Sequence, residues 1–270
     1  MNLRILNQSI TRNLEDLRPR INSVFAPIIT QVSKAPRAIN VATFLSNLNA
    51  VLVGTKVRII KEVTDAFGTP QDTFGRYYPA MGGYCYEPNL NKTARIQLIV
   101  CIHPSINRLP LTVDAWKYFE YRFLKCLTHE LVHRAQFEHG RKHGNALIFR
   151  PHASANLDQR TINEQAYLGD MDEVEAYAHD CVEEWYYMNP HTPLTMREIK
   201  REFRDKGGKL PAIQYYYQTF LGDETHPSVQ RFFRKIKAWD DIIHPLSLEL
   251  PKSPLYVQKD AKTQRHIRMR

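Results

Sequence analysis

The longest uninterrupted helical pattern in this chain covers residues 113–138, and neither proline nor glycine occurs there before Gly140. Near its end it reads Thr-His-Glu-Leu-Val-His, which places His129 and His133 four residues apart with Glu130 beside the first. Residues four apart on a helix lie on one face, about 6 Å apart along its axis. The chain must therefore fold around a long helix that presents two imidazoles side by side.

Two imidazoles in this arrangement can bind one metal ion with nitrogen–metal distances of about 2.0–2.1 Å. Glu130 can reach the open coordination position and accept a proton from a metal-bound water. Zn²⁺ lowers the pKa of such a water to about 7, which makes it a nucleophile at neutral pH. The motif predicts a zinc-dependent hydrolase with His129 and His133 as ligands and Glu130 as general base.

The third ligand must come from another part of the chain, because a catalytic zinc usually has three protein ligands. Between residues 161 and 190 there are eight Asp and Glu and no Lys or Arg. Such a concentration of acids is costly unless a cation lies nearby. A helix predicted from residue 170 or 172 to about residue 187 carries Glu173 and Glu175, each of which begins an E-x-x-A pattern. Periodicity alone does not choose between these two glutamates.

The segments HELVHRAQ and EVEAYA together resemble the zincin metallopeptidases that use HExxH and a downstream glutamate, the gluzincins. They are similar in particular to the pattern HExxHxxQ … ExEA, which is common in phage and bacterial toxin-associated proteins. In that pattern the first Glu of ExEA is the ligand, which corresponds to Glu173. The resemblance covers residues 119–181 and implies a zinc metalloendopeptidase whose small twisted sheet packs on the motif helix. It also implies an edge strand beside the cleft that binds substrate as an added strand, for which 94–102 is the candidate.

Several other residues compete for roles at the site. His139 follows His129 at the metzincin spacing, but Gln136 stands where that family needs a glycine to break the helix. His179 is expected at the surface, with a ligand-bonding or oxyanion role as the alternative. Tyr167 and Tyr177 are expected to pack in the core, with oxyanion stabilisation as the alternative. Weaker candidates for ligand or oxyanion roles are His143 and His152.

Hydrophobic periodicity predicts both helices and strands, with a largely helical C-terminal part, and the resemblance implies that this α+β fold is of the zincin type. Strand-like runs cover residues 56–63, 84–86 and 94–102, and helical runs cover 38–53, 194–206, 211–221 and 227–240. Residues 68–83 are expected to form a loop, 89–91 a turn, and 139–170 an irregular segment. The predicted organisation is an N-terminal helical segment (1–37), a metallopeptidase core (38–190), a helical region packed on the core (191–250) and a basic tail (251–270).

Charge and cysteine usage indicate which partners and which cellular compartment to expect. The net charge is +9, and from residue 191 onward there are 16 Lys and Arg against 9 Asp and Glu. This C-terminal region is expected to make at most weak contact with nucleic acid or an acidic partner. The four cysteines form no CxxC pair and are expected to be reduced. No secretion signal or membrane-spanning run is present, which predicts a cytoplasmic protein without membrane contact, or a virion-associated one if phage-encoded.

The function expected from these features is hydrolysis of peptide bonds in a protein or peptide substrate. The alternative is a non-enzymatic binding or virion-associated protein that keeps a zincin fold around a structural or relict metal site.

Overall fold

The computed structural model describes residues 2–35, 37–63, 80–86, 95–102, 106–109, 112–142, 157–189, 191–205 and 208–249. The chain forms two compact units. Unit 1 comprises Met1–Asn163 and Asp170–Ala176, and unit 2 comprises Glu164–Gly169 and Tyr177–Arg270. Both belong to one broadly α+β chain, as the sequence predicts, with long helices and a few short strands.

Three helices build the framework of unit 1: α1 (Leu3–Lys34), α2 (Val41–Val51) and α3 (Val113–Lys142). Their shared core is aromatic, with ring centroids 5.2–6.2 Å apart. It contains Phe25 of α1, Phe44 of α2, and Trp116, Phe119 and Phe123 of α3. Burial of one face of α1 against this cluster explains why the helix continues through two internal prolines, each of which removes a backbone donor.

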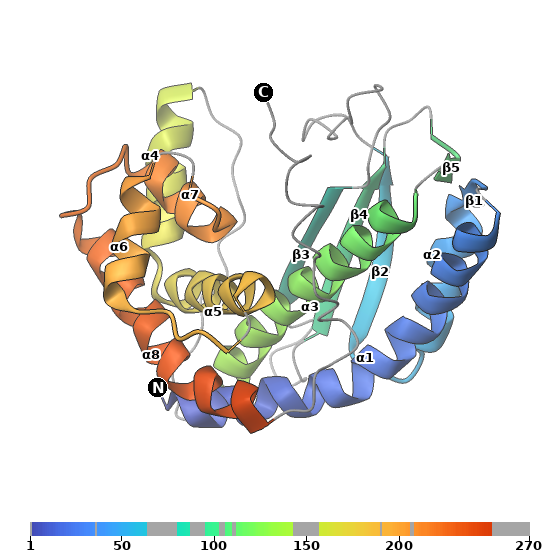
Figure 1. Ribbon diagram of the computed structural model, residues 1–270, viewed down its shortest axis with the longest axis horizontal. Coiled ribbons are helices and arrows are strands. Elements are labelled where there is room, and N and C mark those ends of the chain that lie inside the picture. The colour runs from blue at the N-terminus through green and yellow to red at the C-terminus, as the bar shows by residue number, and fades with distance from the viewer. Residues whose placement is uncertain are drawn as a thin grey trace. The chain divides into compact units, whose positions relative to one another are not determined.

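A three-stranded sheet completes unit 1, with β2 (Val57–Val63), β3 (Ala80–Tyr86) and β4 (Arg95–Ile102). The strand order is β2-β4-β3, in which β4 pairs parallel with β2 and antiparallel with β3. Helix α3 contacts β3 and β4, and Figure 1 shows it lying along the sheet. Short strands β1 (Ile39–Asn40) and β5 (Arg108–Leu109) pair separately.

The sheet corrects one expectation. The strand predicted at 94–102 is present as β4, but it lies in the centre of the sheet and has a neighbour on each side. It therefore has no open edge on which a substrate strand could be added. Among the described strands, β2 and β3 form the two edges. The β2 edge is partly covered, because the Asn49 side chain accepts a hydrogen bond from Ile59 N and donates one to Ile59 O, both at 2.9 Å.

Unit 2 is helical over its described residues. It contains the end of α4 (Leu157–Gly169), most of α5 (Met171–Met188), and α6 (Met196–Arg204), α7 (Pro211–Thr219) and α8 (Pro227–Glu249). Tyr216 stacks on Phe232 with ring centroids 3.7 Å apart. The buried Asp240 carboxylate accepts hydrogen bonds from Tyr186 Oη at 2.6 Å and Leu194 N at 2.9 Å. No described helix of either unit is long and apolar enough to cross a membrane.

Two local predictions are wrong. Residues 80–83 belong to strand β3 although their glycines suggest a loop, and residues 157–169 form helix α4 although they were expected to be irregular. Helix α3 also runs past Gly140 to Lys142. The predicted turn at 89–91 and the tail at 251–270 lie outside the described residues.

Candidate metal centre

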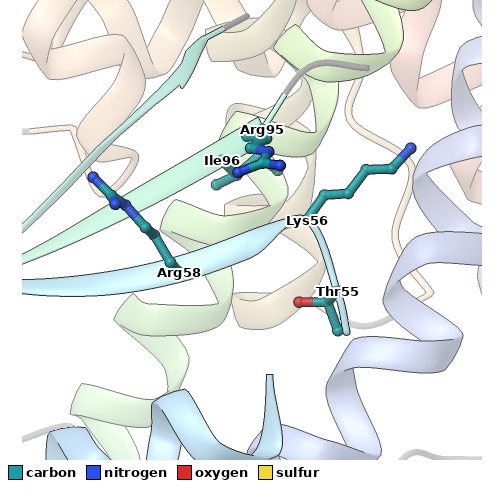
Figure 2. Close-up of a pocket in the computed structure, with 5 residues that line it drawn as sticks. All are labelled: Thr55, Lys56, Arg58, Arg95 and Ile96. Carbon is teal, nitrogen blue, oxygen red and sulfur yellow. The ribbon is translucent and has the colours of Figure 1, made fainter. Parts of the chain in front are cut away.

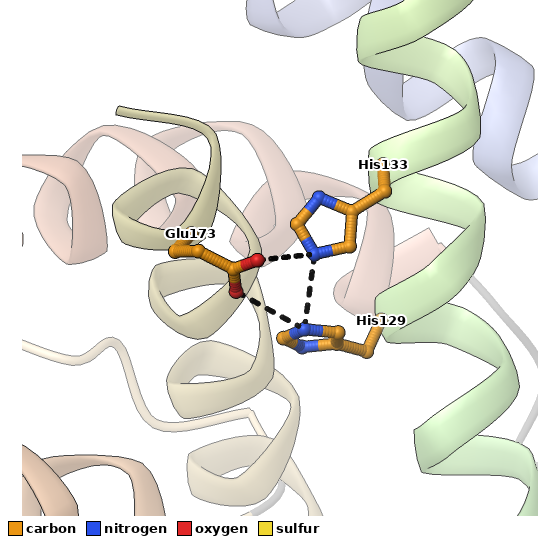
Figure 3. Close-up of side chains that lie close together, drawn as sticks. All are labelled: His129, His133 and Glu173. Carbon is orange, nitrogen blue, oxygen red and sulfur yellow. Dashed lines mark hydrogen bonds and ion pairs between the residues drawn. The ribbon is translucent and has the colours of Figure 1, made fainter. Parts of the chain in front are cut away.

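Unit 1 brings three predicted ligands together: His129 and His133 from α3 and Glu173 from the first turn of α5 (Figure 3). The two Nε2 atoms lie 3.2 Å apart. Oxygen Oε2 of Glu173 lies 3.7 Å from Nε2 of His129, and Oε1 lies 3.4 Å from Nε2 of His133. Each side chain is mostly buried, with 13–17% of its surface exposed. Among the described residues, these three form the single group of His, Cys, Asp or Glu suited to hold a metal ion.

The separations match those that a metal ion imposes. Tetrahedral ligands at 2.0–2.1 Å from one ion lie about 3.3 Å from each other, close to the 3.2–3.7 Å found here. Oxygen Oε2 of Glu173 is also buried without a hydrogen bond to any described residue. A buried carboxylate oxygen without a hydrogen bond is costly, and a cation at this position would offset that cost. The three residues therefore fit a metal ion.

The electrostatics of the group favour a positive charge at its centre. Burial acts to raise the pKa of Glu173, but the adjacent imidazoles of His133 and His129 outweigh it and hold that pKa well below the usual range. Burial acts to lower the pKa of His133, yet the Glu173 carboxylate raises it above the ordinary value. Burial and the Asp170 carboxylate raise the pKa of Asp172 to about 6. The Glu173 carboxylate therefore favours a positive charge at the centre of the group.

Gln136 connects the two helices that carry the ligands. It is 1% exposed, and its Nε2 donates to the backbone oxygen of Asp172 at 3.0 Å, one residue before Glu173. Its Oε1 then faces Nδ1 of His133 at 3.0 Å. Because an amide oxygen only accepts, Nδ1 must carry the hydrogen, which leaves the lone pair of Nε2 for a metal ion. Gln136 therefore orients one ligand and holds the turn that presents another.

Glu130 lies against strand β3. It is 4% exposed, and a Cβ atom placed on Gly83 would come within 2.9 Å of its Cγ and 3.0 Å of its Oε1. Real Cβ contacts essentially never reach 2.9 Å, so only glycine lets β3 approach the carboxylate this closely. The edge strand and the predicted general base are thus in direct contact.

The remaining candidates fall elsewhere. Glu175 is 2% exposed and is not part of the group, so of the two glutamates Glu173 is the one grouped with the two imidazoles. The helix does not break at Gln136, as the alternative ligand His139 would require, because α3 continues to Lys142. The side chains of His139, His143 and His152 lie outside the described residues.

His179, Tyr167 and Tyr177 belong to unit 2. The prediction that His179 is at the surface is wrong, because it is 2% exposed with its ring 4.7 Å from that of Trp239. Tyr167 and Tyr177 pack against each other with centroids 6.3 Å apart, and Tyr177 also packs on Tyr215 at 5.6 Å. Both tyrosines are half-buried, so they make these ring contacts outside the fully buried core in which they were predicted.

No model of a known protein family, no curated protein and no solved structure matches this chain. The chemistry of the site must therefore be argued from its own side chains. Two residues at the site, Gln136 and Gly83, were not assigned a role from the sequence. Gln136 is the last residue of HELVHRAQ, and Gly83 ends a Gly-Gly pair before a strand-like run. Both signals are visible in the sequence, but their roles depend on which segments come together.

Proposed function

We propose that this chain is a zinc-dependent metallopeptidase of the zincin type. The observation that carries the proposal is the arrangement of His129, His133 and Glu173 around one point, with Glu130 next to His129 on the same helix. Two imidazoles and one carboxylate are the ligand set of catalytic zinc sites that keep a fourth position for water or substrate. When bound there, zinc would supply a Lewis acid and lower the pKa of a water molecule.

Glu130 is the residue proposed to move protons. It does not belong to the ligand group, but it is adjacent to His129 in sequence and nearly buried. In this role its carboxylate accepts a proton from the attacking water and later donates it to the leaving amine. Burial beside β3 restricts the positions that the carboxylate can take, which is what a general base needs.

Strand β3 is the proposed substrate-binding edge. It pairs with β4 on one side, and among the described strands it has no partner on the other. Its Gly83 contacts Glu130, so a peptide added along this edge would pass the general base. Main-chain hydrogen bonds to such an edge bind peptides with little regard to sequence, which supports a peptide rather than a small ester as substrate.

The test compares Glu130→Gln with Glu138→Gln, a control on the same helix whose carboxylate pairs with Arg134 at 3.2 Å. The proposal expects Glu130→Gln to keep its zinc and lose at least about a hundredfold in peptide hydrolysis, the usual contribution of a general base. Glu138→Gln should keep both. A Glu130→Gln protein that cleaves peptides as fast as the wild type would contradict the proposed role. Equal function of the two variants in the host, with zinc bound, would favour the non-enzymatic alternative.

A further inference from the structure

The two faces of the sheet in unit 1 differ in chemistry. Register places Ile59 of β2, Leu98 of β4 and Gly83 of β3 in one row. Gly83 contacts Glu130 of α3, so this row faces the motif helix. Side chains alternate between faces along a strand. Arg58 and Gln97 form the neighbouring row, one residue before Ile59 on β2 and one before Leu98 on β4. That row therefore faces away from α3.

Basic side chains lie on that opposite face. Arg58 lies on it, and so does Arg95 at the start of β4, two residues before Gln97. Lys56 directly precedes β2. Lys56, Arg58 and Arg95 line a hollow of about 190 Å³ together with Thr55 and Ile96, here called the basic hollow (Figure 2). This volume holds several water molecules, and so it also holds a small oxyanion. Lys56 also borders a second hollow, together with Asp16 of α1 and Arg134 of α3.

The basic hollow lacks the counter-ions found elsewhere in the chain. Several surface cations in other positions pair with carboxylates, for example Arg20 with Asp16 at 2.9 Å and Arg204 with Glu224 at 2.6 Å. Within the described ranges, no carboxylate lines the basic hollow or forms an ion pair with its three cations. The three like charges border one hollow, where a bound anion would offset their mutual repulsion.

One of the three cations is held in place. Arg58 donates from Nε and Nη2 to the Oε1 atom of Gln97, with the Nε bond at 2.7 Å. Gln97 is 3% exposed, so the guanidinium is fixed by a buried neutral partner that leaves its charge uncompensated. A fixed guanidinium loses less entropy when it binds an oxyanion, and its planar donors suit phosphate.

We propose that the sheet face turned away from α3 carries an oxyanion site, in which Lys56, Arg58 and Arg95 bind a phosphate group. A small phosphorylated molecule and a nucleic-acid backbone both present such phosphate oxygens, and the two probes below distinguish them. The site is independent of the metal centre, since it lies on the opposite face of the sheet from Glu130.

The experiment uses the full chain and two probes, inorganic pyrophosphate and a ten-nucleotide oligothymidylate. The test variant is Lys56→Gln/Arg95→Gln, which leaves the bonds between Arg58 and Gln97 intact. The matched control is Arg4→Gln/Lys117→Gln, which removes two exposed cations from α1 and α3 that have no described ion pair. Unfolding curves of both variants verify that they fold.

The wild type should bind at least one probe at low ionic strength. The test variant should bind it at least about tenfold more weakly, and the control should remain within about twofold. For the single-stranded oligonucleotide, the magnitude of the slope of log affinity against log salt should also fall by about 1.4 in the test variant, which lacks two cations. Binding of pyrophosphate alone identifies a small phosphate as the ligand, and binding of the oligonucleotide alone identifies a nucleic-acid backbone. Absence of binding by the wild type, or equal binding by the two variants, overturns the proposal.

Discussion

Replacing Gln136 with leucine removes the link between His133 and the turn that carries Glu173. Leucine has a similar volume but no polar atom, so the Nδ1 hydrogen of His133 and the backbone oxygen of Asp172 both lose a partner 3.0 Å away. Each buried group left without a hydrogen bond costs about 1–3 kcal/mol. The free energy of unfolding of the metal-free protein should therefore fall by about 2–6 kcal/mol.

The same substitution should weaken metal binding. Loss of a residue that orients a metal-ligating histidine typically costs 10–100-fold in metal affinity, so Gln136→Leu should raise the dissociation constant for zinc by about that factor. Competition with a chromophoric chelator measures this constant, and urea unfolding in excess chelator measures the stability. The matched control is Gln165→Leu in unit 2, which removes a single hydrogen bond to Thr219 O at 2.9 Å. It should lower stability by about 1 kcal/mol and leave zinc affinity unchanged.

Zinc affinity of Gln136→Leu within about twofold of the wild type would refute the reasoning, even if stability falls. It would mean that Gln136 contributes to the fold but does not orient His133 for a metal ion. An equal loss of zinc affinity in Gln165→Leu would also contradict the account, because it would attribute the effect to general destabilisation.

Three further substitutions test separate parts of the structure. Gly83→Ala should displace the Glu130 carboxylate, so peptide hydrolysis should fall by at least about tenfold while zinc content, measured by mass spectrometry, stays unchanged. Burial raises the pKa of Glu120 in the folded state, so ionisation of this carboxyl opposes folding above its ordinary pKa. The variant Glu120→Gln should therefore gain stability relative to the wild type as the pH rises from about 4 to 7, which urea unfolding measures. Asp240→Ala removes the acceptor of the hydrogen bonds from Tyr186 Oη and Leu194 N. The free energy of unfolding, measured by heat or urea, should fall by about 3 kcal/mol.

The sequence alone predicted the parts of the site that depend on local spacing. His129 and His133 are four residues apart on a helix free of proline and glycine, and that spacing determines their common face. Glu173 was assigned through a resemblance, since periodicity could not separate it from Glu175. The structure separates them because only Glu173 lies near the imidazoles.

The parts that were missed depend on contacts between distant segments. Strand order is an example. Nothing in residues 94–102 shows that β3 pairs with β4 on the side opposite β2. The residues around Gly83 resemble a loop by composition, and their place in a strand follows from pairing with β4 and from contact with Glu130. The polar helix α4 was missed for a similar reason, since Tyr216 anchors it through a hydrogen bond to Leu168 O at 2.8 Å.

The central claim is that His129, His133 and Glu173 together hold a metal ion. The most direct test is the zinc content of purified protein, measured by mass spectrometry after dialysis, for the wild type, Glu173→Ala and Glu175→Ala. We expect about one zinc per chain in the wild type and in Glu175→Ala, and little in Glu173→Ala. A folded wild type without zinc that takes up none when it is added, or zinc retained by Glu173→Ala and lost by Glu175→Ala, would contradict the claim.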